Sequence, residues 1–176
     1  MSPSPAADPV AHLAADLVAR LTASEYSVAV AESLTGGLVS AALTDVAGAS
    51  AVLRGGVLAY ATDLKAAVLG VDLKLLAEVG PVAADVAEQM ASGVRALMGA
   101  TYGLATTGVA GPDPVGGRGV GAVYVAVAGP ESSRVKALVL SGDRAAIRAQ
   151  SVLAALMLLA EELDARAGEE ASGFNG

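Results

Sequence analysis

The feature that most constrains this chain is the alternation of short apolar strand patterns with longer helical patterns. Residues 27–31 have the sequence Ser-Val-Ala-Val-Ala, typical of a short strand, and helices are predicted on either side of it over 8–24 and 36–46. Strands interspersed with helices predict a layered α/β domain, and the late pair of strands predicts a mixed sheet. The further strands are predicted over 54–60, 102–107, 120–128 and 134–140, and the further helices over 62–69, 72–78, 83–98 and 143–166.

The hydrophobic content of 54% raises the question of a membrane protein. The longest apolar runs, such as 120–129 and 153–160, are much shorter than the ~20 residues that a spanning helix needs. The excess consists mostly of Ala, Val, Leu and Gly, with one Phe and no Trp. This composition favours helices packed closely on a sheet with small residues at the contacts, and it predicts no membrane partner.

Charge and cysteine content exclude several functional classes. The chain has 11 Lys plus Arg against 18 Asp plus Glu, a net charge of −7, and no basic cluster, so direct nucleic-acid binding is not expected. It has no cysteine, which excludes disulfides, zinc–thiolate sites and a cysteine nucleophile. With one His and scattered carboxylates, neither a metal site nor a cofactor is predicted.

The predicted organisation is a single domain over residues 8–166, with flexible tails over 1–7 and 167–176. Residues 1–8 lack the positive and apolar regions of a secretory signal, so a cytoplasmic location is expected. The Ala-rich final helix can pack on its own core or on a neighbouring copy, which leaves a homo-oligomer open.

Residues 31–37, Ala-Glu-Ser-Leu-Thr-Gly-Gly, form a strand-to-helix turn that can carry chemistry. Such a turn aims the Ser33 side chain off the carboxyl end of a strand, where free N–H groups of the helix start can bind a phosphate or an oxyanion. Gly36 and Gly37 let a ligand approach the backbone closely. In the alternative interpretation, Ser33 or Thr35 only caps the helix.

A serine nucleophile needs a base, and the only histidine, His12, falls on the first helix, where a surface role is expected. Lysine can replace histidine, because a desolvated amine accepts a proton near neutral pH. Of the three lysines, Lys136 falls in a late strand and Lys74 in a short helix. Lys65 follows Tyr60 at the carboxyl edge of the sheet, where α/β active sites form, although a solvated lysine beside a packed tyrosine is the alternative.

Residues 106–121 form a glycine-rich loop that leaves a strand. It can wrap a ligand, with a hydroxyl from Thr107 and backbone donors around Gly108, or it can be a simple flexible connection. It is not a P-loop, because no Gly-Lys-Ser/Thr follows at the required spacing.

Two arginines mark the start of the final helix. Asp143 suits the N-cap, and Arg144 and Arg148 form an i, i+4 pair that can reach a phosphate. The alternative is a solvated pair of surface charges.

Taken in order, these segments resemble the CinA C-terminal domain family over residues 11–165. The matching stretches are 31–37, 43–50, 54–57 continuing to Tyr60 and Lys65, 69–71, 107–113, 120–121 and 142–144. The resemblance implies a three-layer α/β/α domain with a mixed, mostly parallel sheet. It also implies a stand-alone amidohydrolase of pyridine nucleotide salvage that converts nicotinamide mononucleotide to nicotinate mononucleotide and ammonia.

The same resemblance implies an acyl-enzyme route with Ser33 as nucleophile, Lys65 as its base and Tyr60 assisting. Capping of the second helix then falls to Thr35 or to the backbone. The predicted contacts to a small-molecule nucleotide substrate come from Glu32, Thr35, Gly36, Gly37, Thr107, Gly108, Arg144 and Arg148.

Three departures from the family pattern leave the catalytic set in place: Leu34 removes a thiol, and those at Ala122 and in residues 114–119 bear on substrate contacts. Leu34 stands where relatives usually carry Cys, and Ala122 replaces a frequent Thr. Residues 114–119 are Pro-Val-Gly-Gly-Arg-Gly, where a Gly-Gly pair and then Lys-Pro are common. Two alternatives stay open: an amidase for another phosphate-bearing amide, and a non-catalytic nucleotide-binding module associated with competence or DNA damage.

Overall fold

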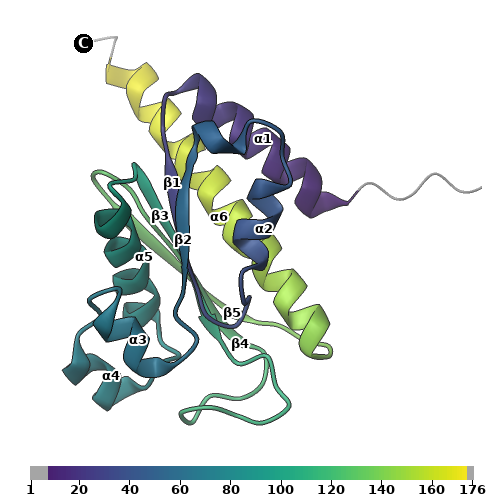
Figure 1. The fold of residues 1–176 in the computed structure, drawn as a ribbon, viewed down its shortest axis with the longest axis vertical. Helices are drawn as coiled ribbons and strands as arrows, with labels where there is room; N and C mark the ends of the chain where they lie inside the picture. The colour runs from purple at the N-terminus through teal and green to yellow at the C-terminus, as the bar shows by residue number, and fades with distance from the viewer. Residues whose placement is uncertain (1–7, 174–176) are drawn as a thin grey trace, which may run out of the picture.

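Five strands form one sheet with helices on both faces (Figure 1). The computed structural model of the chain describes residues 8–173, with side chains as far as Glu169. The strands are β1 (Val28–Glu32), β2 (Leu53–Leu58), β3 (Tyr102–Gly108), β4 (Ala122–Ala128) and β5 (Ser133–Val139). The helices are α1 (Pro9–Ala23), α2 (Leu38–Thr44), α3 (Thr62–Ala67), α4 (Leu73–Val79), α5 (Ala84–Met98) and α6 (Arg144–Gly173), with a 3₁₀ turn η1 (Ala49–Ala51).

The strand order is β2-β1-β3-β4-β5. Strand β1 pairs in parallel with β2 and β3, whereas β4 runs antiparallel to β3 and β5. Four strands therefore run in one direction and only β4 in the other. Helices α1, α2 and α6 cover one face and α3, α4 and α5 the other (Figure 1), so the predicted three-layer α/β/α fold with a mixed, mostly parallel sheet is confirmed. The carboxyl ends of β1, β2 and β3 meet at one edge.

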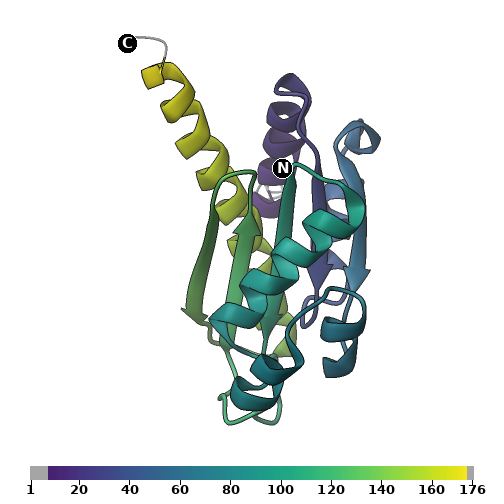
Figure 2. The same ribbon diagram turned by 90° about the vertical axis from the view of Figure 1, so that its left-hand side faces the viewer.

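The two faces of the sheet differ in side-chain size. Alternate residues of β1 point to opposite faces, so that Val28 and Val30 pack under α1 and α6 while Ala29 and Ala31 lie under α5. On the α5 face even a methyl group is too large at Gly103, since a Cβ there would lie 1.9 Å from the carbonyl oxygen of Ala91. Helix α5 consequently lies close on the sheet (Figure 2), and the small residues predicted at helix–sheet contacts are found there.

The aspartates predicted at two helix starts cap them. The Asp8 carboxylate accepts a 3.0 Å hydrogen bond from Val10 N, and the Asp143 carboxylate accepts one of 2.8 Å from Ala146 N. Each bond satisfies a backbone donor that the first helical turn leaves unpaired.

The predicted end of the last helix at residue 166 is wrong, because α6 continues to Gly173. Gly168 costs only about 1 kcal/mol inside a helix, and the Ala and Glu residues around it favour helix, so the chain does not break there. The short turn η1 was not predicted. Of the tails expected over 1–7 and 167–176, residues 167–173 are part of α6, and residues 1–7 and 174–176 lie outside the described residues.

Over residues 8–173, no helix combines the length and the apolar character needed to cross a bilayer.

Candidate active site

Ser33 lies directly after β1, at the edge where the three parallel strands end. Its backbone N–H donates to the Thr106 carbonyl of β3 at 3.1 Å, and on the other side Ala59 N donates to the Glu32 carbonyl at 2.9 Å. The turn that carries Ser33 is therefore anchored between the ends of two neighbouring strands. The Ser33 side chain lines a cavity although the residue is only 8% exposed.

Lys65 is in α3 and is 1% exposed. Its Nζ donates to Ser33 Oγ at 3.0 Å and to the carbonyl oxygen of Ala59 at 2.7 Å. Burial disfavours the charged amine and lowers the pKa of Lys65 from 10.5 to about 8. At neutral pH about a tenth of the molecules then carry a neutral amine, which can take the proton of the Ser33 hydroxyl.

The cavity in front of Ser33 and Lys65 has a volume of about 150 Å³. A space of this size holds a single aromatic ring and is smaller than sites that enclose whole ligands, so the remainder of a larger ligand would lie at its mouth. Its lining comes from the ends of β1, β2 and β3, from α3, from Pro81 and Val82, from the glycine-rich loop and from the start of α6. The polar or charged side chains in the lining are those of Ser33, Tyr60, Thr62, Lys65, Thr107, Asp113 and Arg144.

Glu32 does not face this cavity. Its buried carboxylate accepts hydrogen bonds of 3.0 Å from Gly37 N and Val39 N, of 2.8 Å from Ser40 N and of 2.7 Å from Ser40 Oγ. The N–H groups of the α2 start, predicted to bind an anion, are thus occupied by the chain's own carboxylate, and the predicted substrate contacts from Glu32 and Gly37 are not brought to the cavity.

The prediction that Thr35 or the backbone caps α2 holds for the backbone, since Leu38 N donates to the Thr35 carbonyl at 3.2 Å, while the Glu32 carboxylate takes the neighbouring donors. Thr35 is fully buried, and its Oγ1 lies 2.7 Å from Thr106 Oγ1. Neither Thr35 nor Gly36 lines the cavity, so these two predicted substrate contacts are not brought to it.

The two arginines of α6 have different surroundings. Arg148 donates from Nε to the Leu34 carbonyl and from Nη2 to the Thr35 carbonyl, each at 3.0 Å, and it is not part of the cavity lining. Arg144 is exposed and lines the cavity mouth. The structure thus separates the predicted phosphate-binding pair into one arginine at the site and one beneath the Ser33 turn.

Tyr60 lines the cavity but is not in hydrogen-bond contact with Ser33 or Lys65. It is 56% exposed, and its hydroxyl accepts a 2.7 Å bond from Arg144 Nη2. Arg144 Nη1 donates to the Gly111 carbonyl at 2.7 Å, so that this side chain bridges the end of β2 and the glycine-rich loop. A direct role of Tyr60 on the base is therefore not supported by these contacts.

The predicted loop residues Thr107 and Gly108 do line the cavity, and Thr107 Oγ1 donates to the Pro81 carbonyl at 2.7 Å. Thr62, Pro81 and Asp113 are lining residues that sequence reasoning missed. The Gly80-Pro81 break between two helices was the available signal for Pro81.

The other candidate bases lie away from the cavity. His12 is exposed on α1, with Nδ1 3.1 Å from the Asp8 carbonyl oxygen. Lys74 is exposed, and Lys136 pairs with Glu161 at 2.5 Å. Among the described residues no group of three or more His, Asp or Glu side chains is placed to hold a metal ion.

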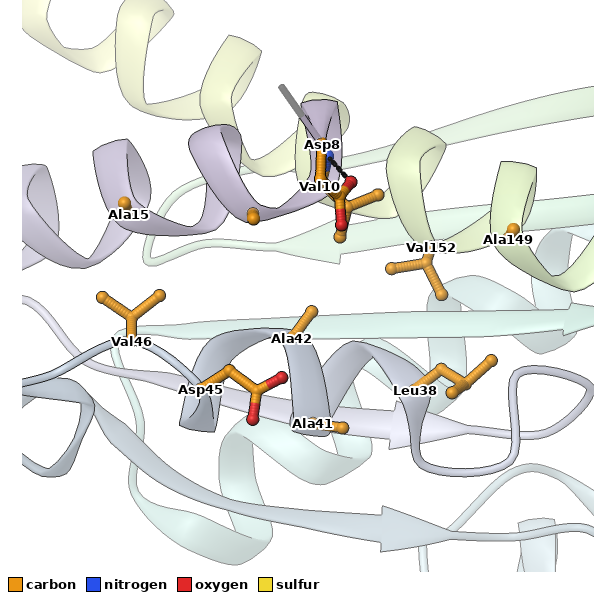
Figure 3. Close-up of a pocket in the computed structure, with 11 residues that line it drawn as sticks. Asp8, Val10, Ala15, Leu38, Ala41, Ala42, Asp45, Val46, Ala149 and Val152 are labelled. Atoms are coloured by element: carbon orange, nitrogen blue, oxygen red, sulfur yellow. Dashed lines mark hydrogen bonds between the residues drawn. The ribbon is translucent and has the colours of Figure 1, made fainter. Parts of the chain in front are cut away.

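A larger cavity of about 540 Å³ lies elsewhere, between α1, α2 and α6 (Figure 3). Its lining is mainly apolar, from Val10 and Leu38 to Val152, with Asp8 and Asp45 as its carboxylates. Its lining has no serine, threonine, lysine or histidine, whereas the smaller cavity at the strand ends brings a hydroxyl and a buried amine together, which makes the smaller cavity the candidate site.

The family assignment rests on sequence and fold together. A family model described as the CinA C-terminal domain matches residues 10–163, which include Ser33, Lys65 and the other lining residues. The chain belongs to the CinA C-terminal domain family.

Relatives of this CinA domain with curated sequences are longer proteins. A CinA-like protein of Frankia casuarinae is 53% identical over 133 residues, covering 76% of this chain and 31% of that protein. A CinA-like protein of Anaeromyxobacter dehalogenans is 49% identical over 146 residues, covering 81% of this chain and 35% of that protein. The chain spans about a third of the length of these relatives.

Solved CinA structures have the same fold. The competence/damage inducible protein CihA from Agrobacterium tumefaciens superposes with a TM-score of 0.86 at 34% identity, covering 93% of this chain and 99% of that one. The competence damage-inducible protein A from Klebsiella pneumoniae gives a TM-score of 0.86 at 32% identity, covering 89% and 98%.

Proposed function

We propose that this CinA domain is an amidohydrolase that uses a Ser33–Lys65 dyad to convert nicotinamide mononucleotide to nicotinate mononucleotide and ammonia. The observation that carries the proposal is the 3.0 Å contact between Lys65 Nζ and Ser33 Oγ at a cavity. A buried amine with its pKa lowered to about 8 is costly to maintain in a fold, and it suits a general base.

In the first half-reaction, neutral Lys65 takes the proton of Ser33 as Oγ attacks the amide carbonyl carbon and the carbonyl electron pair moves onto oxygen. When the tetrahedral intermediate collapses, the C–N bond breaks and Lys65 passes the proton to the leaving nitrogen. Ammonia departs, and the acyl group remains on Ser33 as an ester.

In the second half-reaction, Lys65 takes a proton from water as the water oxygen attacks the ester carbon. Collapse breaks the ester bond, and Lys65 returns the proton to Ser33 Oγ. The sum is one amide and one water consumed, and one carboxylic acid and one ammonia formed. The proton passes only between Ser33, Lys65, water and the leaving group, so this scheme calls on no cofactor.

The choice of substrate is supported by the size and charge of the site. The cavity of about 150 Å³ suits a ring with its carboxamide, which leaves the ribose and phosphate at the mouth. Arg144 is exposed there, and its guanidinium complements a phosphate. In this proposal the phosphate displaces the Tyr60 hydroxyl from Arg144, and Tyr60 contributes to substrate placement rather than to proton transfer.

The test is ammonia release from nicotinamide mononucleotide by the wild-type chain and three variants. Ser33→Ala and Lys65→Ala are expected to lose activity by at least about 10⁴-fold, as nucleophile or base removal does in serine hydrolases. Lys74→Ala is the matched control, because Lys74 is exposed and outside the cavity lining, and it should retain full activity.

Other outcomes would redirect the assignment. Full activity in both Ser33→Ala and Lys65→Ala would overturn the dyad mechanism. Turnover of a different phosphate-bearing amide in a parallel screen, with none of the mononucleotide, would keep the mechanism and change the substrate. Tight nucleotide binding without product over hours would point instead to a non-catalytic binding module.

A further inference from the structure

The turn that carries Ser33 is held from two sides by charged side chains. On one side the Glu32 carboxylate accepts the N–H groups of Gly37, Val39 and Ser40. On the other side Arg148 donates to two successive carbonyls of the turn, through Nε to Leu34 O and through Nη2 to Thr35 O, each at 3.0 Å. The backbone immediately after Ser33 is thereby fixed by ionised groups, whose hydrogen bonds are stronger than neutral ones.

The turn has the shape that admits this guanidinium. Gly36 has a φ of +62°, and a Cβ at that position would lie 3.1 Å from Arg148 Nη2. A side chain at residue 36 would therefore crowd the guanidinium as well as strain the backbone. The conformation of this turn therefore requires both a residue without a Cβ at position 36 and the guanidinium of Arg148.

We propose that Arg148 is a positioning residue for the reaction at Ser33. By holding the Leu34 and Thr35 carbonyls, it fixes the turn so that the N–H group of Leu34, a residue of the cavity lining, can receive the oxygen of the tetrahedral intermediate. This inference rests on the proposed acyl-enzyme function.

Peptide geometry links the arginine to this donor. Arg148 Nη2 binds Thr35 O, so the N–H on the other side of that planar trans peptide, that of Gly36, points away from the guanidinium. Gly36 N donates to the Ser33 carbonyl at 3.1 Å, and the Leu34 N–H lies on the opposite side of the peptide that is held in this way. Among the hydrogen bonds between described residues, none uses Leu34 N as donor. Preorganised donors beside a nucleophile stabilise an oxyanion strongly, and removal of one costs about 10²–10³-fold in kcat.

The alternative is that Arg148 binds the substrate phosphate. Its Nε and Nη2 already serve the turn, and the residue does not line the cavity. A phosphate contact would change KM only for a phosphate-bearing substrate, whereas a positioning role changes kcat for any amide that reacts with Ser33.

The experiment compares Arg148→Ala and Arg148→Lys with wild type on nicotinamide mononucleotide and on nicotinamide riboside, which lacks the phosphate. We expect Arg148→Ala to lower kcat about 100-fold for each substrate, with KM unchanged within about twofold. Added guanidinium should restore part of the lost rate. Arg148→Lys should fall between the two, because an ammonium cannot reproduce the fork of the guanidinium.

A second readout does not depend on the natural substrate. Labelling of Ser33 by a fluorophosphonate probe, followed by intact mass, should slow about 100-fold in Arg148→Ala and recover partly with guanidinium. Arg54→Ala is the matched control, since Arg54 also donates from Nε to a backbone carbonyl, that of Met98 at 2.9 Å, but lies outside the cavity lining. It should label at the wild-type rate.

The outcomes separate the two proposals. Unchanged labelling in Arg148→Ala would overturn the positioning role, as would a KM defect confined to the mononucleotide. A loss that guanidinium does not restore would overturn it too. If wild type hydrolyses neither amide but Ser33 still reacts with the probe, the proposed substrate fails while the labelling rates still decide the role of Arg148.

Discussion

Replacing Lys65 by Met removes a buried amine and should make the stability of the protein less dependent on pH. Lys65 is 1% exposed, and burial lowers its pKa from 10.5 to about 8. At about 1.36 kcal/mol for each tenfold change in proton affinity, this difference opposes folding by about 3 kcal/mol at pH 7. The two hydrogen bonds that Met cannot make, to Ser33 Oγ and Ala59 O, offset part of this gain.

The sign of the pH effect follows from proton binding. Between pH 8 and 10.5 the unfolded chain holds a proton on Lys65 more tightly than the folded chain does, so the free energy of unfolding of wild type rises with pH across this window. Relative to Lys65→Met, wild type should gain about 2 kcal/mol between pH 7 and pH 9.5. The lost hydrogen bonds change the offset between the two proteins and leave this slope almost unchanged.

Urea unfolding of wild type and Lys65→Met at several pH values between 7 and 9.5 measures this difference directly. The four tyrosines and the other lysines are common to both proteins, so their titration cancels in the difference. A difference curve that is flat over this range would refute the claim that burial depresses the proton affinity of Lys65, and with it the reason for treating this residue as a base.

Three further predictions follow from the same contacts. The kcat/KM for ammonia release should rise about tenfold per pH unit below pH 8 and level off above it, because only neutral Lys65 accepts a proton; a flat profile would contradict this. Glu32→Gln should lower the free energy of unfolding by about 3 kcal/mol in urea titrations, since an amide NH₂ cannot accept the donors of the α2 start. Gly103→Ala should cost at least about 2 kcal/mol by the same measurement, because its Cβ would meet Ala91 O at 1.9 Å, whereas Gly119→Ala, with nothing within 4 Å, should be neutral.

The alternation of Val and Ala in β1 illustrates why the fold was predictable. Strands with period-two alternation, placed between helical patterns, are compatible with only a few α/β folds. Each strand and α-helix of the structure was predicted at its place in the chain. The error in the last helix arose where residues that favour a helix surround a glycine, which only weakly disfavours one. The last helix was predicted to end at residue 166, just before Gly168, but a single glycine costs too little to stop a helix.

The candidate dyad was predictable for a different reason. With one histidine on α1 and three lysines, Lys65 was the best-placed candidate, and the family resemblance implied its role as base; the fold brings Lys65 Nζ to 3.0 Å from Ser33 Oγ. The roles of Glu32 and Arg148 were not predictable, because each depends on where a side chain points. A carboxylate after a strand and an arginine on a helix have the same local sequence signature whether they face a ligand or the chain's own backbone.

By itself the sequence determined the order of strands and helices, the small residues under α5, and the turn that presents Ser33. These features follow from the spacing of apolar residues and from the positions of glycines, and both are set by residues that are close together in the chain. Only the tertiary structure decided that Arg144 lies at the cavity and Arg148 beneath the turn that carries Ser33, although they are one helical turn apart. That assignment depends on contacts with residues more than a hundred positions earlier in the chain, such as Leu34. The burial of Lys65 also depends on the tertiary structure, because its amine loses water only once the helices have packed on the sheet.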